Sequence, residues 1–544
     1  MGIRFTRSWV VLLIGCLVAP PLRAETLSTA FEQLGIETEP LEFHEFSGVQ
    51  FKLNGVTAYV VEPKEWASGK PWIWRARFWG HEPELDLALL KRGYAVAYCD
   101  VQNLFGSPQA VARWNEFYAV AQKLQLHPKP ILEGMSRGGL IVFNWAKANP
   151  QCVSAVYGDN PVCDIRTWPA KYSPDDWKRC LAAYELTESQ ASEFQGNPID
   201  GLQPLADADV PVYLVLGEDD RVVPIEQNGL ELARRYQALG GTVRTWRKPG
   251  QGHHPHGLHP VTPLLNELLI ASPRDELDPL PLEMLTAKQR ILVLGDSITY
   301  SGQYVSHLAT WAKQTHQMPA ERFLNVGVPS ETVSGLSEPG HAGGKFPRPD
   351  LHERLARVLD HTKPDLILAC YGMNDGIYQS FDSERFQAYQ AGLTKLKQAA
   401  DERSVNIVFF TPPVYDAHQQ AEQLEYEGVM HCYASWLIAQ HHEQGWHVID
   451  LHFAMQRQLD ANRASDPQFT WQSDSVHPND AGHRAMAAAV IHGFAPEFDP
   501  AELDSPTYRA QFAETHETLK TIQQSKLEAT GHRRPNIPGY RPEK

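Results

Sequence analysis

Pro130-Ile-Leu-Glu-Gly-Met-Ser-Arg-Gly-Gly139 decides the fold of the first half of the chain. The stretch begins as a short apolar strand and runs into Gly139–Ala148, whose apolar residues recur at helical spacing. Between strand and helix, Ser136 stands in a G-x-S-x-G pattern with Gly134 and Gly138 on either side. A sharp strand-to-helix turn needs such small neighbours and presents the serine hydroxyl at the sheet edge, so the pattern predicts a nucleophile elbow.

Short apolar runs alternate with amphipathic stretches on both sides of this turn, which predicts a mainly parallel sheet covered by helices on both faces. The predicted strands of the first half are Thr57–Val61, Trp72–Arg77, Ala95–Val101, Pro130–Glu133, Ala155–Gly158, Val212–Leu216 and Val243–Arg247. The predicted helices include Glu84–Arg92, Gln109–Leu124, Gly139–Ala148 and Ile225–Leu239. The second half repeats the alternation, with strands near 291–294, 323–326, 366–370, 407–410 and 447–450. We therefore expect an α/β protein with two doubly wound domains.

A serine nucleophile needs a base, and the base needs an acid to orient it. In chains with this elbow the acid follows the serine and precedes the histidine. The apolar strand Val212–Leu216 leads into a turn in which the spacing G-x-x-D-x-x-V-P favours Asp220 as the acid. Asp219 is the alternative acid in the same turn, and Glu218 is expected to be a solvated turn residue.

The expected base lies in the stretch Pro249-Gly-Gln-Gly-His-His-Pro-His256. His253 directly follows a glycine after a predicted strand and is the first choice, with His254 as the alternative. A different interpretation of the same stretch is a histidine-rich surface loop or an adventitious metal site.

With these three residues, the segment from about residue 40 to 270 resembles the α/β-hydrolase family. The resemblance implies an oxyanion hole made of two backbone N–H groups. One is expected from Arg137, the residue after the nucleophile. The other is expected from Arg77 or Phe78, in the loop after the predicted strand Trp72–Arg77. Here the sequence reads Arg75-Ala-Arg-Phe-Trp-Gly-His81 and departs from the HGGG pattern of lipases, so the choice between Arg77 and Phe78 stays open.

Four separated blocks in the second half lie at strand ends or in loops, at the edge where open α/β sheets bind ligands. They are Ile291–Thr299 with Gly-Asp-Ser, Phe323–Pro329, Leu366–Asp375 and Asp474–Pro478. Together they supply the parts of a second serine active site.

In this second site Ser297 is the expected nucleophile, His477 the general base and Asp474 the acid that orients it. A D-x-x-H pair supplies base and acid from one loop. The oxyanion is expected to be held by the backbone N–H groups of Ser297 and Gly327 and by the side-chain amide of Asn374. Glycine at position 327 is expected to let the backbone approach the substrate closely.

The order Ser-Gly-Asn-His over about residues 289–495 resembles the SGNH (GDSL-type) hydrolase family, which implies a flavodoxin-like fold. Asp296 and Asp375 are expected to be structural loop carboxylates. Pro478 and His483 need no catalytic role.

Both sites predict acyl transfer to water through a serine acyl-enzyme, for which neither a metal nor an organic cofactor is needed. A chain with two such sites resembles bacterial carbohydrate esterases, which implies acetylated plant or algal polysaccharides or oligosaccharides as substrates. Two alternatives remain open for the first domain: a non-catalytic carbohydrate-binding or scaffolding module, and a peptidase or lipase.

The amino terminus has the order of a secretory signal over residues 1–24: Arg4 and Arg7, an apolar run, then a small residue before Glu25. The run is shorter than the roughly 20 residues that span a bilayer, so no membrane span is expected. Leu13-Ile-Gly-Cys16 resembles a lipobox, and a lipid anchor at Cys16 is the alternative to free secretion. The formal net charge of −16 argues against a nucleic-acid partner, which needs a basic surface.

We expect the first domain over residues 25–271, a Pro-containing linker over 272–288, the second domain over 289–496, and a polar, partly helical tail over 497–544. Six of the seven cysteines follow the expected cleavage site. A disulfide among Cys152, Cys163 and Cys180 is open in an exported protein, whereas Cys370 and Cys432 are expected to be buried thiols.

Overall fold

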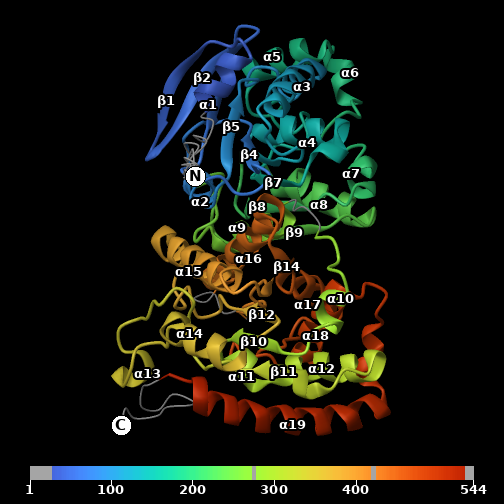
Figure 1. The fold of residues 1–544 in the computed structure, drawn as a ribbon. Coiled ribbons are helices and arrows are strands. Elements are labelled where there is room, and N and C mark those ends of the chain that lie inside the picture. The colour runs from blue at the N-terminus through green and yellow to red at the C-terminus, as the bar shows by residue number, and fades with distance from the viewer. Residues whose placement is uncertain (1–26, 273–276, 418–423, 533–544) are drawn as a thin grey trace, which may run out of the picture.

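Residues 27–272, 277–417 and 424–532 are described by the structure, a computed structural model. It has two domains, each built on its own sheet, one above the other in Figure 1. The predicted signal sequence, the lipobox at Cys16 and the end of the tail lie outside the described residues. Among the residues that are described, no helix is both long and apolar enough to cross a membrane.

The first sheet has nine strands in the order β1-β2-β3-β5-β4-β6-β7-β8-β9. The first four strands in this order pair antiparallel, and from β5 to β9 all pairs are parallel. The position of β5 between β3 and β4 is the strand crossing of an α/β-hydrolase fold. The strands are β1 (Thr38–Phe43), β2 (Phe46–Leu53), β3 (Val56–Val61), β4 (Trp72–Arg75), β5 (Ala95–Cys99), β6 (Ile131–Met135), β7 (Ala155–Asp159), β8 (Val212–Gly217) and β9 (Val243–Lys248).

Strands β1 and β2 are absent from the sequence prediction because neither contains a continuous apolar run, and only Phe43 of β1 is buried. The predicted helix Ile225–Leu239 is divided in two at Asn228, whose φ of −125° and ψ of −99° are not helical. Its side chain accepts the backbone N–H of Cys163 at 2.8 Å, a bond to a distant loop that no local pattern foretells.

Helices cover both faces of this sheet. On one face Trp114 of α3 stacks on Trp74 of β4 with ring centroids 3.9 Å apart, in a core shared with α1, α4 and α8. On the other face α2 and α9 contribute leucines to a core that continues into the second domain. The helices are α1 (Leu27–Gln33), α2 (Glu84–Leu90), α3 (Pro108–Lys123), α4 (Gly138–Ala148), α5 (Pro174–Tyr184), α6 (Glu188–Ser192), α7 (Gln203–Asp207), α8 (Gly229–Ala238) and α9 (Thr262–Ala271), with short 3-10 turns η1 (Pro150–Cys152) and η2 (Ile225–Gln227).

The second sheet has five strands, all parallel, in the order β11-β10-β12-β13-β14. This is the flavodoxin-like order, in which the chain reverses direction across the sheet next to β10 and leaves a crevice at the carboxyl ends of the strands. The strands are β10 (Ile291–Gly295), β11 (Phe323–Asn325), β12 (Leu366–Cys370), β13 (Asn406–Phe410) and β14 (His447–Ile449). Their positions agree with the predicted strands to within a residue or two.

The helices of the second half are α10 (Glu283–Thr286), α11 (Ser297–Ser301), α12 (Gln303–His316), α13 (His341–Gly344), α14 (Leu351–Thr362), α15 (Ser383–Asp401), α16 (Leu424–Gln444), α17 (His452–Ser465), α18 (Asp480–Phe494) and α19 (Pro506–Thr530), with 3-10 turns η3 (Ala320–Arg322) and η5 (Pro500–Asp504). The tail packs on the second domain as far as its last described residue, His532. Helix α19 runs along the side of this domain away from the first domain (Figure 1), and the Tyr508 hydroxyl donates to the carbonyl of His307 at 2.8 Å. Beyond the helix, His532 pairs with the buried Glu331 at 2.7 Å.

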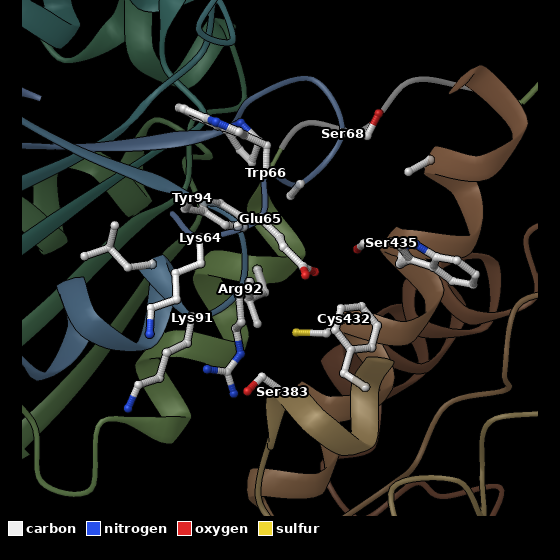
Figure 2. Close-up of a pocket in the computed structure, with 18 of the residues that line it drawn as sticks. Lys64, Glu65, Trp66, Ser68, Lys91, Arg92, Tyr94, Ser383, Cys432 and Ser435 are labelled. Atoms are coloured by element: carbon white, nitrogen blue, oxygen red, sulfur yellow. The ribbon is translucent and has the colours of Figure 1, made fainter. Parts of the chain in front are cut away.

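The two domains share an interface in which α9 packs against α16. Within it the Asn266 amide donates to the carboxylate of Glu427 at 3.2 Å. Burial raises the pKa of Glu427 to about 7. A cavity of about 680 Å³ lies beside this contact and takes its walls from both domains (Figure 2). On its wall, Arg92 of the first domain contacts Phe381 of the second, with the guanidinium 4.5 Å from the ring centre.

All six cysteines in the described part of the chain are free thiols. Cys152, Cys163 and Cys180 form no disulfide there, and Cys370 and Cys432 are buried, as expected from their apolar surroundings. Burial raises the pKa of the Cys432 thiol, which lies on the wall of the cavity in Figure 2.

Candidate active sites

Ser136 occupies the turn between β6 and α4 with a φ of +50°, a conformation that side-chain-bearing residues rarely adopt. The turn is possible because its neighbours are glycines. A Cβ at Gly134 would lie 2.5 Å from Val142 and 3.0 Å from the backbone of Gly138. The elbow is fixed to the sheet by the N–H of Ser136, which donates to the carbonyl of Asp159 at 2.8 Å.

The structure brings Ser136, His253 and Asp220 into one hydrogen-bonded chain. The Ser136 hydroxyl lies 2.9 Å from Nε2 of His253, and Nδ1 of the same ring lies 2.6 Å from Oδ2 of Asp220. The other carboxylate oxygen of Asp220 accepts the N–H groups of Val222 and Val223, both at 2.8 Å. These bonds hold the acid in place and leave Nδ1–H of the histidine as its remaining donor.

The other two acidic residues of this turn have different contacts. Glu218 pairs with Arg247 at 2.8 Å, and the N–H of Asp219 donates to the carbonyl of Gln251. Asp220 is the acid that reaches His253, and its side chain is fully buried.

Asn160 is a part of the first site that the sequence analysis missed. Its amide donates to the carbonyl of His253 at 3.2 Å and its oxygen accepts the N–H of Gly217 at 2.7 Å. It thereby ties the histidine loop to the end of β8. A usable signal was its place directly after a buried strand, at the edge where ligands bind.

Arg137 and Arg77, the two residues expected to supply backbone donors, lie at and beside the elbow. Arg137 is at the amino end of α4, where backbone N–H groups have no helical partner. A Cβ at Gly138 would lie 3.9 Å from the backbone nitrogen of Arg77, so the loop after β4 runs alongside the elbow. This neighbourhood favours Arg77 over Phe78. The Arg137 guanidinium lies over the ring of Trp168 at 5.0 Å, and its pKa is lowered by burial and by the charge of Arg77.

The second site is assembled in the same way at the carboxyl end of β10. The Ser297 hydroxyl lies 2.8 Å from Nε2 of His477, and Nδ1 of His477 lies 2.7 Å from Oδ2 of Asp474. The other oxygen of Asp474 accepts the N–H groups of His477 at 2.7 Å and Val476 at 3.0 Å. Burial acts to raise the pKa of Asp474, but the bonds from His477 and Val476 outweigh it and lower the pKa.

The two triads differ sharply in their exposure to solvent. The side chains of His253 and Asp220 are 9% and 0% exposed, whereas those of His477 and Asp474 are 52% and 53% exposed. The first site is therefore enclosed and the second lies open. Neither is in the interdomain cavity of Figure 2, whose described walls contain no triad residue.

The amide of Asn374 is held in one orientation by two donors that the sequence analysis did not identify. Arg348 Nη1 and the Tyr378 hydroxyl donate to its Oδ1 at 2.8 and 2.9 Å. Because Oδ1 is occupied, the N–H groups of Nδ2 are the part of the amide that can donate to an oxyanion. Nδ2 also makes a long contact of 3.4 Å to the carbonyl of Glu331. Arg348 is itself paired with Glu338 at 2.6 Å.

Gly327, the second expected backbone donor, lies close to α11. Its N–H donates to Oδ1 of Asn325 at 2.9 Å, so this predicted oxyanion donor is already bonded within the chain. A Cβ at Gly327 would lie 2.7 Å from the nitrogen of Tyr300 and 2.9 Å from the carbonyl carbon of Thr299. Packing against α11 therefore requires glycine at this position.

Asp296 and Asp375 support loops, as their positions suggested. Asp296 caps α11 by accepting the N–H of Ile298 at 2.9 Å, and burial raises its pKa to about 7. Asp375 accepts the N–H groups of Val333 and Ser334 at 2.9 and 2.8 Å, and burial raises its pKa to about 6.

Sequence comparison identifies the second domain. Residues 293–485 match the GDSL-like Lipase/Acylhydrolase family. The matched range includes Ser297, Gly327, Asn374 and His477. This match supports the assignment of the protein as a carboxylic ester hydrolase. Comparison with curated proteins finds no match.

Comparison with solved structures finds chains that are similar over the first domain. A puromycin-hydrolyzing peptidase of Mycobacterium tuberculosis is 16% identical, with 43% of this chain and 38% of that chain covered and a TM-score of 0.33. Est1E from Butyrivibrio proteoclasticus is 17% identical, with coverages of 41% and 97% and a TM-score of 0.31. An S-formylglutathione hydrolase from Agrobacterium tumefaciens is 12% identical, with coverages of 43% and 96% and a TM-score of 0.32.

The chain spans about two fifths of the length of the puromycin-hydrolyzing peptidase. The fold of the first domain stands on its strand order and on the elbow between β6 and α4. The protein thus joins an α/β-hydrolase fold to a GDSL-like hydrolase domain.

Proposed function

We propose that the chain is a secreted serine esterase with two independent active sites that removes O-acetyl groups from plant or algal polysaccharides or oligosaccharides. The observation that carries the proposal is the presence of two complete Ser–His–Asp chains, whose bonds are 2.9 and 2.6 Å in the first domain and 2.8 and 2.7 Å in the GDSL-like domain. The amino-terminal sequence supports export.

Each triad can carry out the same reaction, and in the GDSL-like domain the steps are these. His477 takes the proton of Ser297 as the hydroxyl attacks the ester carbonyl, and Asp474 stabilises the imidazolium that forms. The negative oxygen of the tetrahedral intermediate accepts hydrogen bonds from the N–H of Ser297 and from Asn374. The intermediate collapses as its bond to the sugar oxygen breaks. This oxygen takes the proton from the imidazolium and leaves as the sugar hydroxyl, while the acyl group stays on the serine. Water then repeats the steps and releases the free acid.

The surroundings of the open site support a bulky carbohydrate substrate. Tyr300 follows the nucleophile by three residues and is 38% exposed, and Tyr378, which bonds to Asn374, is 36% exposed. Exposed aromatic faces beside a serine nucleophile suit the apolar faces of sugar rings. The enclosed first site favours a smaller acylated group or a chain end.

Acetate release from acetylated xylan, pectin and simple acetylated sugars tests the proposal with wild type, Ser136→Ala, Ser297→Ala and the double variant. We expect each single variant to keep part of the activity, with different substrate preferences, and the double variant to lose all of it. A single replacement that abolishes activity on every substrate would refute two independent sites. Faster hydrolysis of long acyl chains or peptides than of acetate would refute the acetylesterase assignment.

The first domain has its own test, because a non-catalytic module would not react with a serine probe. In full-length Ser297→Ala, a fluorophosphonate probe can label only the first-domain nucleophile among the two proposed. We expect labelling at Ser136 and its loss in the double variant. Absence of labelling in folded Ser297→Ala would make the first domain an accessory module.

A further inference from the structure

Three histidine rings gather at the first active site, and the triad uses only one of them. The ring centroids of His253, His254 and His256 are 5.2, 4.8 and 4.8 Å apart, and one ring nitrogen from each lies within 4.8 Å of the others. All three come from a four-residue stretch of the loop after β9. His81 from the loop after β4 adds a fourth ring, with its centroid 6.0 Å from that of His256.

The spacing of these rings is that of a tetrahedral zinc site. With Zn–N bonds of about 2.0 Å, each ring centroid lies about 3.2 Å from the ion, and two such rings at the tetrahedral angle lie about 5.2 Å apart. The observed centroid separations are 4.8 to 5.2 Å, so the rings bind an ion mainly by rotating in place. The ring nitrogens now lie within 4.8 Å of one another and would be about 3.3 Å apart around an ion, so they move closer by up to about 1.5 Å.

Two of the rings already have the orientation that a metal ligand needs. Nδ1 of His253 lies 2.6 Å from Asp220, and Nδ1 of His256 lies 3.1 Å from Asp159. A carboxylate at one nitrogen fixes the tautomer and leaves Nε2 as the lone-pair donor, as in the carboxylate–histidine–zinc arrangements of metal sites. Asp159 is held in turn by the N–H of Gly257 and by the Tyr157 hydroxyl at 3.2 Å.

His254 is the exposed member of the set, so an ion reaches the cluster from solvent.

We infer that His253, His254 and His256 form a binding site for one divalent transition-metal ion of the zinc type, and that the ion switches off the first active site. Nε2 of His253 cannot bind a metal and accept the Ser136 hydroxyl, now 2.9 Å away, at the same time. The fourth position is open to water or His81. The GDSL-like domain keeps its activity, so the metal selects between the two sites. The inhibitory part of the inference rests on the proposed role of His253 as base, whereas the binding part does not.

Zinc binding to the full chain, measured by competition with a chromophoric chelator, tests the site without any assay of activity. We expect one ion per chain in wild type and at least tenfold weaker binding in His254→Gln and in His256→Gln. His256 is buried and bonded to Asp159, so the exposed His254 provides the variant that leaves the core intact. His361→Gln, at an exposed histidine near the end of α14, is the matched control and should bind like wild type.

Ser136→Ala removes the bond that the ion must displace, so we expect this variant to bind zinc at least as tightly as wild type. In wild type, one equivalent of zinc should slow fluorophosphonate labelling of Ser136 at least tenfold and leave labelling of Ser297 unchanged. Equal zinc affinity in wild type and His254→Gln would overturn the site. Tight binding that leaves Ser136 labelling unchanged would overturn the switch and retain the site.

Discussion

Replacing the acid of each triad by asparagine should damage the two active sites to very different degrees. In both triads one oxygen of the acid is held by two backbone N–H groups, at Asp220 and at Asp474 alike. Asparagine therefore keeps its oxygen there and turns its NH₂ toward Nδ1 of the histidine. This arrangement favours the wrong tautomer and removes the charge that stabilises the imidazolium.

The magnitude follows from the exposure of each pair. Charges about 4 Å apart interact by about 4 kcal/mol at the effective dielectric constant of a protein site and by about 1 kcal/mol in water. Asp220 is fully buried, so its interaction with His253 is about 4 kcal/mol. Asp474 is 53% exposed, so its interaction with His477 is about 1 kcal/mol. Asp220→Asn should thus lower kcat about 10³-fold or more, and Asp474→Asn about 5- to 50-fold.

The two sites must be assayed one at a time, because both are expected to hydrolyse simple esters. Asp220→Asn is measured in the Ser297→Ala background and Asp474→Asn in the Ser136→Ala background, with p-nitrophenyl acetate and with the rate of fluorophosphonate labelling. Circular dichroism and the melting temperature report whether each variant is folded. Equal losses at the two sites, or a larger loss at Asp474, would refute the argument that burial sets the strength of the acid.

Three further outcomes are expected. Glu427→Gln should stabilise the chain by up to about 3 kcal/mol at pH 8. Native Glu427 has a pKa near 7, so wild type should lose stability as the pH rises from about 4.5 to 7, whereas the glutamine variant should not. A melting temperature that the substitution changes equally at pH 5 and pH 8 would contradict this. Tyr378→Phe should lower kcat of the GDSL-like domain about 5-fold by removing one donor to Asn374, with little change in KM, and a change confined to KM would argue against orientation of the amide. His532→Ala should cost about 2 to 4 kcal/mol by leaving the buried Glu331 without one of its partners, which urea unfolding measures; a loss below about 0.5 kcal/mol would show that the tail does not stabilise the domain.

Local patterns sufficed wherever the deciding interactions are local in the chain. The strands of the second sheet are continuous apolar runs because both of their faces are covered, and such runs can be found without a structure. The D-x-x-H pair of Asp474 and His477 closes within three residues, so its spacing already contains its geometry. The elbow at Ser136 is likewise set by its flanking glycines.

The sequence by itself determined the two α/β domains, the two serines and the order of their partners. Only the tertiary structure decided between Asp220 and Asp219, because the bond to His253 spans 33 residues and depends on how two loops meet. The same holds for the donors that orient Asn374, for the bond that occupies Gly327 and for the three rings at the first site. Hydrogen bonds and ring contacts between distant segments arise from packing, which the spacing of residues along one segment does not encode.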